Sequence, residues 1–287
     1  MTVAAAIGAG RRTLVAALAV SAIELAAPAA RAQGITLRLH PHVGDTLHTR
    51  LEQQTEVTAT MRGPSGGAPT TRTVTTSIAL HSRTIVRASS PASTLVLTMV
   101  DSIQLHSTDP HSAEQVAQAE QMLRRQQLLL QLATDGTVEG ARDVRGVALP
   151  QDIADAMAVM PAVFPGHPVR VGDAWTRVMP LPSGGPLGAR GAGHVNAVFR
   201  LDSLDRSGNL AYVSMHGDIV TDRESEGVRL SGVLNGSMLV DRVRGWMTDS
   251  RCTVLLRSAV TPAPSTGLAP MSFVTKVTQR LRTMDKR

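Results

Sequence analysis

The chain contains few cysteines, aromatic residues and lysines, and these shortages exclude several kinds of protein. One cysteine, Cys252, stands among 287 residues, so no internal disulfide can form and stability must come from burial and hydrogen bonding. Aromatic residues make up 2% of the chain, and only Lys276 and Lys286 are lysines. The net charge of +6 is therefore carried by arginines, which are interleaved with Asp and Glu. A nucleic-acid surface usually clusters basic residues around stacking aromatic rings, so we do not expect nucleic acid as a partner.

The sequence also has no apolar run long enough to cross a membrane. Its clearest run, residues 13–23, is too short for the roughly 20 apolar residues that a spanning helix needs. Arg11 and Arg12 precede this run, and Ala30-Arg31-Ala32 supplies a small-x-small cleavage site after it. This order is typical of an export signal. We therefore expect residues 1–32 to be removed and the remainder to be exported, periplasmic or extracellular, and not membrane-spanning.

Most of the remaining chain alternates apolar and polar residues with period two, which predicts strands. In residues 71–88, Val74, Ile78, Leu80 and Val86 share one parity and polar side chains occupy the other. Strands with one wet face are typical of antiparallel sheets, because parallel strands are covered on both faces. Glycine-containing turns such as Asp135-Gly136 separate the alternating segments. We expect a mainly β (α+β) protein with ten or eleven strands in a large curved antiparallel sheet or half-barrel.

Two segments break the alternation and predict short helices. In residues 112–127, Ser112 and Gln115 form a possible capping box ahead of an apolar stripe. In residues 150–164, Met157 and Met160 recur at helical spacing before the helix is stopped by proline. We expect these helices to cover the concave face of the sheet.

A short internal echo divides the chain. Residues 40–50 and 167–177 share a His-Pro start and a Val-Gly-Asp turn that leads into a strand. The echo favours an N-terminal β unit over 33–148 and a C-terminal β unit over 149–287, each with one helix, or one continuous domain. Whether the two halves share one sheet stays open at this stage.

No motif in the sequence indicates catalysis or metal binding. Gly-x-Ser-x-Gly, Ser-x-x-Lys and His-Glu-x-x-His are absent, and the glycine-rich stretches lack the context of a nucleotide loop. His40, His42 and His48 share the polar parity of their strand, so we interpret them as a solvated face and not as metal ligands. The acidic residues between 218 and 226 lack the ligand spacing of a calcium loop. We expect no catalytic residue, metal or cofactor, although a triad assembled from distant residues stays possible in principle.

Short pieces of the chain resemble those of known exported proteins. The segment Val171-Gly172-Asp173-Ala174-Trp175 and the Asp135-Gly136 hairpin are similar to pieces that recur in uncharacterised families of exported bacterial β-rich proteins. The overall pattern is more distantly similar to Lol-type periplasmic lipoprotein carriers and their mycobacterial lipid-carrying relatives. That resemblance implies a strongly curved antiparallel sheet that wraps an apolar ligand against short helices, and it implies no individual site residue.

These observations favour an exported, non-enzymatic carrier of a lipid, acyl chain or lipoprotein, bound in a groove between sheet and helices. An envelope structural or protein-interaction module with a filled core is the alternative, and a hydrolase is a third. The oligomeric state and the ligand's identity stay open. The apolar candidates for lining the groove are Leu97, Met157, Met160, Leu234 and Met238.

Overall fold

The structure is a computed structural model that describes residues 34–61, 68–146, 149, 163–181, 193–221, 228–261 and 270–284. The expected export signal and most of the predicted second helix lie outside these ranges. Within them, no helix combines the length and the apolar character needed to cross a membrane. The elements are β1 (Thr46–Met61), β2 (Thr70–Ser89), β3 (Ser93–Ser107), the 3-10 turn η1 (Pro110–Ser112), α1 (Ala113–Arg124), β4 (Gln127–Ala133), β5 (Val138–Asp143), β6 (Ala174–Pro180), β7 (Gly193–Leu204), β8 (Leu210–Thr221), β9 (Val228–Asp241), β10 (Trp246–Val260) and β11 (Met271–Met284).

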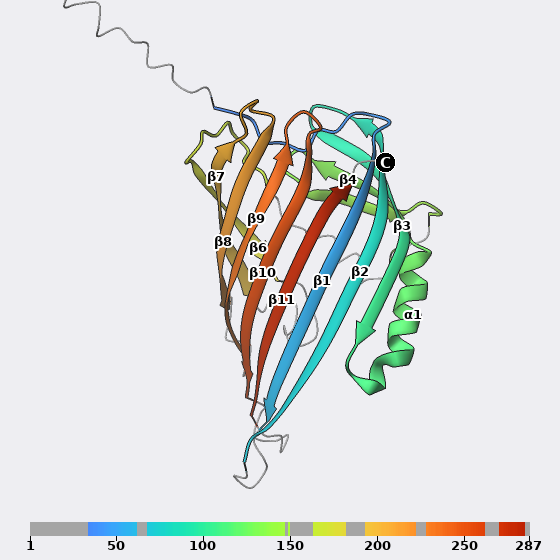
Figure 1. Ribbon diagram of the computed structural model, residues 1–287, viewed down its shortest axis with the longest axis vertical. Helices are drawn as coiled ribbons and strands as arrows, with labels where there is room; N and C mark the ends of the chain where they lie inside the picture. Colours follow the sequence, from blue (N-terminus) through green and yellow to red (C-terminus); the bar gives the residue numbers. More distant parts are fainter. Residues whose placement is uncertain are drawn as a thin grey trace, which may run out of the picture. The chain divides into compact units, whose positions relative to one another are not determined.

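All eleven strands belong to one antiparallel sheet, which confirms the predicted fold class. The strand order is β5-β4-β3-β2-β1-β11-β10-β9-β8-β7-β6. The chain runs outward from the centre through β1 to β5, restarts at the opposite edge with β6, and returns to the centre with β11 (Figure 1). The two halves expected from the echo therefore share one sheet, through the β1–β11 ladder, and residues 35–287 form one compact unit. Within the described residues β5 and β6 do not pair with each other, so the sheet is open.

One face of the sheet is concave and carries the core. Val86 and Val96, from β2 and β3, belong to the same buried cluster as Phe199 and Val240, from β7 and β9. Because these strands come from opposite sides of the sheet, the sheet must curl to bring them together. On β1 the odd-numbered residues from Leu47 to Met61 lie on this concave face, and the register extends it to the neighbouring strands.

Glycines on β8 and β9 permit a close approach of neighbouring strands. Gly217, Gly232 and Gly236 all lie on the concave face, and the register sets each one opposite a large side chain of the neighbouring strand. A Cβ atom added at Gly236 would lie 2.4 Å from the carbonyl oxygen of Arg251, and one at Gly232 would lie 2.2 Å from that of Leu255. Strand glycines are typical of such close backbone approaches.

Two irregular segments close the core at one end of the sheet. The first contains Leu37 and Leu39, and the second contains Phe164 and Val169; all four side chains are buried. An isolated antiparallel bridge joins the segments, with Ile35 and Val169 exchanging both backbone hydrogen bonds at 2.7 and 2.9 Å. The segments before the two Val-Gly-Asp turns therefore lie side by side.

The second of these segments also links strands from opposite sides of the sheet. The carbonyl oxygen of Asp135, in the β4–β5 turn, accepts the N–H groups of Val163 and Phe164 at 2.9 and 3.0 Å. From β6, Trp175 Nε1 donates to the carbonyl oxygen of Val163 at 3.0 Å, and Arg177 Nη2 donates to that of Phe164. At this end the open sheet is thus joined across its gap through the backbone of Val163 and Phe164, by backbone hydrogen bonds on the β4–β5 side and by side-chain hydrogen bonds on the β6 side.

The helices differ from the sequence prediction in four respects. The helix predicted over 112–127 is present as α1 but ends at Arg124, and Val163 and Phe164 at the end of the second predicted helix are not helical. The capping box is wrong, because Ser112 Oγ donates to the carbonyl oxygen of Asp109 at 2.7 Å and caps nothing in α1. The expectation that this helix covers the concave face is also wrong, since α1 lies alongside β3 and buries none of its residues (Figure 1).

Candidate functional site

The concave face of the central strands carries one continuous row of aliphatic side chains. Leu51 on β1 lies in register with Leu281 on β11 and with Leu80 on β2, and Leu80 is in register with Ile103 on β3. Ile103 is buried, whereas the three leucines are only half-buried. Because directly opposed side chains on neighbouring strands touch, these four residues form one apolar strip across four strands.

Charge is divided sharply between the two faces. On β1 and β8–β11 of the described chain, the register assigns no Asp, Glu, Lys, Arg or His to the concave face. The convex face instead holds an ion-pair network in which Asp249 lies 3.2 Å from Arg280, 3.5 Å from Arg251 and 3.6 Å from Arg282. Asp249 and Arg280 are half-buried, whereas Arg251 and Arg282 are exposed, so the network stays in contact with water. The further basic and acidic residues of the convex face on these strands include Arg50, Glu52, Glu56, Asp218, Arg229, Arg257 and Lys276.

An amide pair lies at the centre of the concave face, among aliphatic and hydroxyl side chains that carry no charge. Gln53 on β1 and Gln279 on β11 are register partners, and Cys252 on β10 is the next partner of Gln279. Cys252 Sγ donates to Gln279 Oε1 at 3.7 Å, and Gln53 Nε2 donates to Thr55 Oγ1 at 3.3 Å. Burial raises the pKa of the Cys252 thiol, so the group is a neutral, weak hydrogen-bond donor at neutral pH.

The residues predicted to line a groove are not all brought together. Leu234 and Met238 lie on the concave face of β9 and are buried in the core, at 8% and 4% exposure. Leu97 alternates with the core residue Val96 and therefore points to the opposite face. There its register partner Leu129 lines a hollow of about 290 Å³ over β4 and β5. The remaining two predicted residues, Met157 and Met160, lie outside the described residues.

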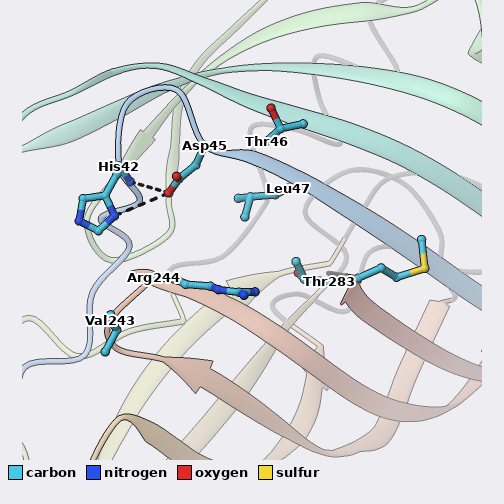
Figure 2. A pocket seen from close by; sticks show the side chains of 8 residues that line it. His42, Asp45, Thr46, Leu47, Val243, Arg244 and Thr283 are labelled. Carbon is cyan, nitrogen blue, oxygen red and sulfur yellow. Dashed lines mark hydrogen bonds and ion pairs between the residues drawn. The ribbon is translucent and has the colours of Figure 1, made fainter. Parts of the chain in front are cut away.

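A separate pocket of about 310 Å³ opens at one end of the sheet, where β1 begins and β11 ends (Figure 2). The side chain of Arg244 extends from the β9–β10 turn toward Thr283, while His42 and Asp45 lie at the other side. His42 Nδ1 lies 3.7 Å from the Asp45 carboxylate, and Arg244 Nε lies 3.7 Å from Asp241. Both basic groups of the pocket therefore have a carboxylate neighbour.

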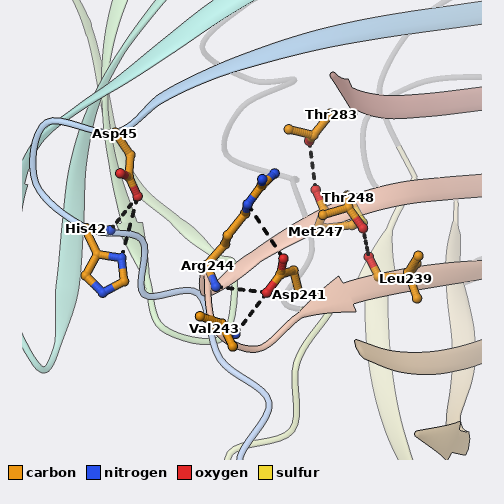
Figure 3. Close-up of polar contacts among 9 residues, drawn as sticks. All are labelled: His42, Asp45, Leu239, Asp241, Val243, Arg244, Met247, Thr248 and Thr283. Carbon is orange, nitrogen blue, oxygen red and sulfur yellow. Dashed lines mark hydrogen bonds and ion pairs between the residues drawn. The ribbon is translucent and has the colours of Figure 1, made fainter. Parts of the chain in front are cut away.

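Backbone contacts make this pocket a structural joint. The Asp241 carboxylate accepts the N–H groups of Val243 and Arg244 at 2.9 Å each and so fixes the β9–β10 turn (Figure 3). The carbonyl oxygen of Gly245 in the same turn accepts the N–H of His40 at 2.8 Å. The pocket is at the lower limit of ligand-pocket volumes, and the joint that forms it anchors the N-terminal segment. Across the described residues, no three His, Cys, Asp or Glu side chains come close enough to hold a metal ion.

Sequence reasoning missed the apolar strip and the amide pair, because both depend on pairing between strands. The alternation assigned Leu80 and Leu281 to apolar faces, but nothing local in the sequence sets β1 between β2 and β11. The only available signal for Leu51 and Gln53 was their shared parity within residues 46–61.

Comparisons with known proteins give little further guidance. No protein-family model matches the chain, and no curated protein matches it in sequence. Among solved structures, one described as lipid–protein interactions in lipovitellin matches 85% of this chain with a TM-score of 0.45 and 8% identity. The match spans 25% of that chain, so this protein corresponds to a quarter of its length.

Two further structures are less similar. An outer membrane channel from Pseudomonas putida F1 matches 85% of this chain and 96% of its own, with a TM-score of 0.22 and 11% identity. DynF from the dynemicin biosynthesis pathway of Micromonospora chersina matches 89% and 88%, with a TM-score of 0.21 and 10% identity. All these TM-scores fall below 0.5, so we argue the function from the residues of this chain alone.

Proposed function

We propose that the protein is a non-enzymatic binding or carrier module that holds an apolar ligand, such as a lipid or acyl chain, against the concave face of its sheet. One observation supports this most directly. The concave face of β1 and β8–β11 has no ionisable Asp, Glu, Lys, Arg or His in the described chain, and aliphatic residues at its centre stay only half-buried.

The energetic reason is the cost of leaving such a face wet. Burial of apolar surface contributes about 25 cal/mol per Å². Leu51, Leu80 and Leu281 are half-buried and adjacent, so an apolar chain laid across them would remove further apolar surface from water. An ionised ligand would meet no opposite charge on this part of the face and would lose its hydration without compensation.

The test introduces a charge on this face and compares it with the same change on the opposite face. Val277 is half-buried on the concave side of β11, and Thr278 next to it is exposed on the convex side. We expect the purified protein to enhance the fluorescence of the hydrocarbon probe diphenylhexatriene. Val277→Asp should weaken probe binding at least tenfold, and Thr278→Asp should leave it unchanged, with circular dichroism and thermal unfolding as controls for folding.

The outcomes separate the two leading functions. Absence of probe binding by the unmodified protein, together with native mass spectra free of copurified lipid, would contradict the carrier. It would favour a structural or protein-interaction module, for which the buried core at the closed end of the sheet is the supporting observation. Export is a separate part of the proposal and rests on residues 1–32. Cell fractionation and the N-terminal sequence of the secreted form test it.

A further inference from the structure

We infer that the ligand is an uncharged amphiphile whose hydrogen-bonding head group binds Gln53 and Gln279. This inference rests on the proposed function and adds to it the chemical class of the ligand. Its basis is an amide pair placed at the centre of a surface that carries aliphatic and hydroxyl side chains but no charge, on the two strands that join the halves of the sheet.

The amide pair still has hydrogen-bonding capacity. Gln53 Nε2 donates a hydrogen bond to Thr55 Oγ1, which leaves the side-chain carbonyl oxygen of Gln53 as an acceptor. Gln279 Oε1 accepts a weak hydrogen bond from the Cys252 thiol, which leaves the NH₂ group of Gln279 as a donor. Both side chains are half-buried, and their backbones are paired directly. One acceptor and one donor group at neighbouring positions match a hydroxyl, an amide or an undissociated acid.

The surroundings of the pair favour an amphiphile over a small polar molecule. On one side, two residues along the strands from the amides, lies the row of Leu51, Leu80 and Leu281. On the other side the same face continues with Val277, which is paired with Thr55, and then with Val57, which is paired with Thr275. Successive residues on one face of a strand are about 6.8 Å apart, so aliphatic side chains extend on both sides of the amides over distances comparable to an alkyl chain, with Thr55 and Thr275 between them on one side.

The absence of charge around the pair favours a neutral head group. The ionised residues of the described central strands lie on the convex face, behind the backbone. A carboxylate or phosphate head at the amide pair would be partly desolvated with only neutral partners, which costs more than it gains. A glycerol, alcohol or amide head group also loses hydrogen bonds to water, but the two glutamines can replace most of them.

The experiment uses three probes and one double variant. The fluorescence of diphenylhexatriene measures its binding to the concave face. Two competitors then displace it at pH 9, 1-monooleoylglycerol and oleate, both below their micellar concentrations. In the unmodified protein we expect monooleoylglycerol to displace the probe at concentrations at least tenfold lower than oleate. In Gln53→Leu/Gln279→Leu, monooleoylglycerol should lose affinity on the order of tenfold or more, as expected for two hydrogen bonds. Probe binding should be kept or strengthened.

Gln54→Leu is the matched control, because Gln54 is the next residue of β1 and is exposed on the convex face. This variant should change the affinity for neither monooleoylglycerol nor oleate. This inference would be overturned if the double variant bound monooleoylglycerol as tightly as the unmodified protein does, or if the unmodified protein bound oleate more tightly than monooleoylglycerol. Binding of diphenylhexatriene would still support the proposed function in either case. Failure of the unmodified protein to bind diphenylhexatriene at all would overturn both.

Discussion

Asp45 and Asp173 accept equivalent hydrogen bonds in two turns that lie far apart in the sequence. The Asp45 carboxylate accepts the N–H of His42 at 3.0 Å, and the Asp173 carboxylate accepts the N–H of Arg170 at 2.8 Å. In return, each aspartate donates its own N–H to the carbonyl oxygen of the same partner residue, at 3.1 and 2.9 Å. The side chain and the backbone thus close the turn together.

The two turns also dock on their neighbouring strands in the same way. Gly44 and Gly172 have φ angles of 90° and 94°, a conformation that favours glycine. Gly44 donates to the carbonyl oxygen of Val86 on β2, and Gly172 donates to that of Leu201 on β7, at 3.0 and 2.7 Å. Each docked strand is the next in the chain after the strand that the turn opens. The echo found in the sequence is therefore a repeated structural device.

Removing either carboxylate should destabilise the protein by a similar amount. We expect Asp45→Ala and Asp173→Ala each to lower the free energy of unfolding by about 1 kcal/mol, because each loses one turn-closing hydrogen bond. Urea unfolding followed by circular dichroism measures the change. Asp218→Ala, at an exposed aspartate of β8, is the control and should have little effect. Unchanged stability in both turn variants would show that the backbone alone closes these turns.

Gly236→Ala should destabilise the protein more strongly than a turn variant. The added methyl group would lie 2.4 Å from the carbonyl oxygen of Arg251 and 3.0 Å from Met215 Cε. Since a backbone carbonyl cannot move without disturbing the β9–β10 ladder, we expect a loss of about 2–3 kcal/mol in a thermal or urea unfolding experiment. Gly166→Ala is the control, because no atom lies within 4 Å of its added Cβ. Equal effects at both positions would contradict a close backbone approach at Gly236.

The sheet could be predicted from the sequence because strand alternation is a local property. Residues 71–88 carry most of their large apolar side chains on one parity and their charged ones, such as Arg83 and Arg87, mostly on the other, and the structure forms β2 there. Residues 95–100 carry apolar side chains on both parities, so their alternation does not say which face is buried. This is why Leu97 was assigned to the same surface as Leu234, although the structure directs it to the opposite face.

The position of α1 could not be predicted for a related reason. Its apolar stripe indicated a partner surface, but the stripe could not say whether that surface is a sheet face or a strand edge. The pairing of Gln53 with Gln279 is also a product of the β1–β11 ladder, which joins the two ends of the described chain. Contacts between residues so far apart in the sequence leave no local pattern.

The pH dependence of stability should include a contribution from Asp143. Its carboxylate accepts hydrogen bonds from Arg145 Nε and Nη2 at 3.0 Å each and from the Arg145 backbone N–H at 2.7 Å. The side-chain hydrogen bonds from Arg145, with the backbone bond next, hold the pKa of Asp143 below its ordinary value. A lowered carboxyl pKa stabilises the folded state above the unfolded pKa, and this contribution is lost as the pH falls below about 4.

Arg145→Met should return the pKa of Asp143 toward its ordinary value. An NMR titration of the side-chain carboxyl carbon measures this directly. Arg142→Met, at an exposed arginine of the same strand, is the control and should leave the Asp143 titration in place. An Asp143 carboxyl that titrates identically in the Arg145 variant would contradict the hydrogen-bond origin of the shift.

Cys252 should react slowly with alkylating reagents. Only the thiolate is nucleophilic, and burial raises the pKa of this thiol, so at pH 8 less of it is ionised than in a free cysteine. We expect iodoacetamide to modify the folded protein several-fold more slowly than a cysteine peptide, with the rate rising as the pH rises. An Arg257→Cys/Cys252→Ser variant moves the thiol to an exposed position on the convex face of β10 and should react faster. A native rate equal to that of the peptide would contradict a buried, neutral thiol.

The free edge of β3 should depend on α1 for protection. β3 pairs with β4 only over Ser93–Met99, and beyond that point α1 supplies the missing partners. Glu120 Oε1 accepts the N–H of Leu105 at 2.6 Å, and Arg124 Nη2 donates to the carbonyl oxygen of Ile103 at 3.1 Å. Unpaired backbone groups on a strand edge promote association between chains, so these two side chains block that edge.

Glu120→Ala should therefore expose a backbone donor as well as remove a side chain. We expect faster hydrogen exchange at the Leu105 amide and a lower solubility limit, with a loss of about 1 kcal/mol in unfolding free energy. Gln118→Ala, at an exposed position of the same helix, removes a side chain without touching β3 and serves as the control. If Leu105 exchanges equally slowly in both variants, α1 packs beside the strand without protecting it. The edge must then be shielded by the twist of the sheet alone.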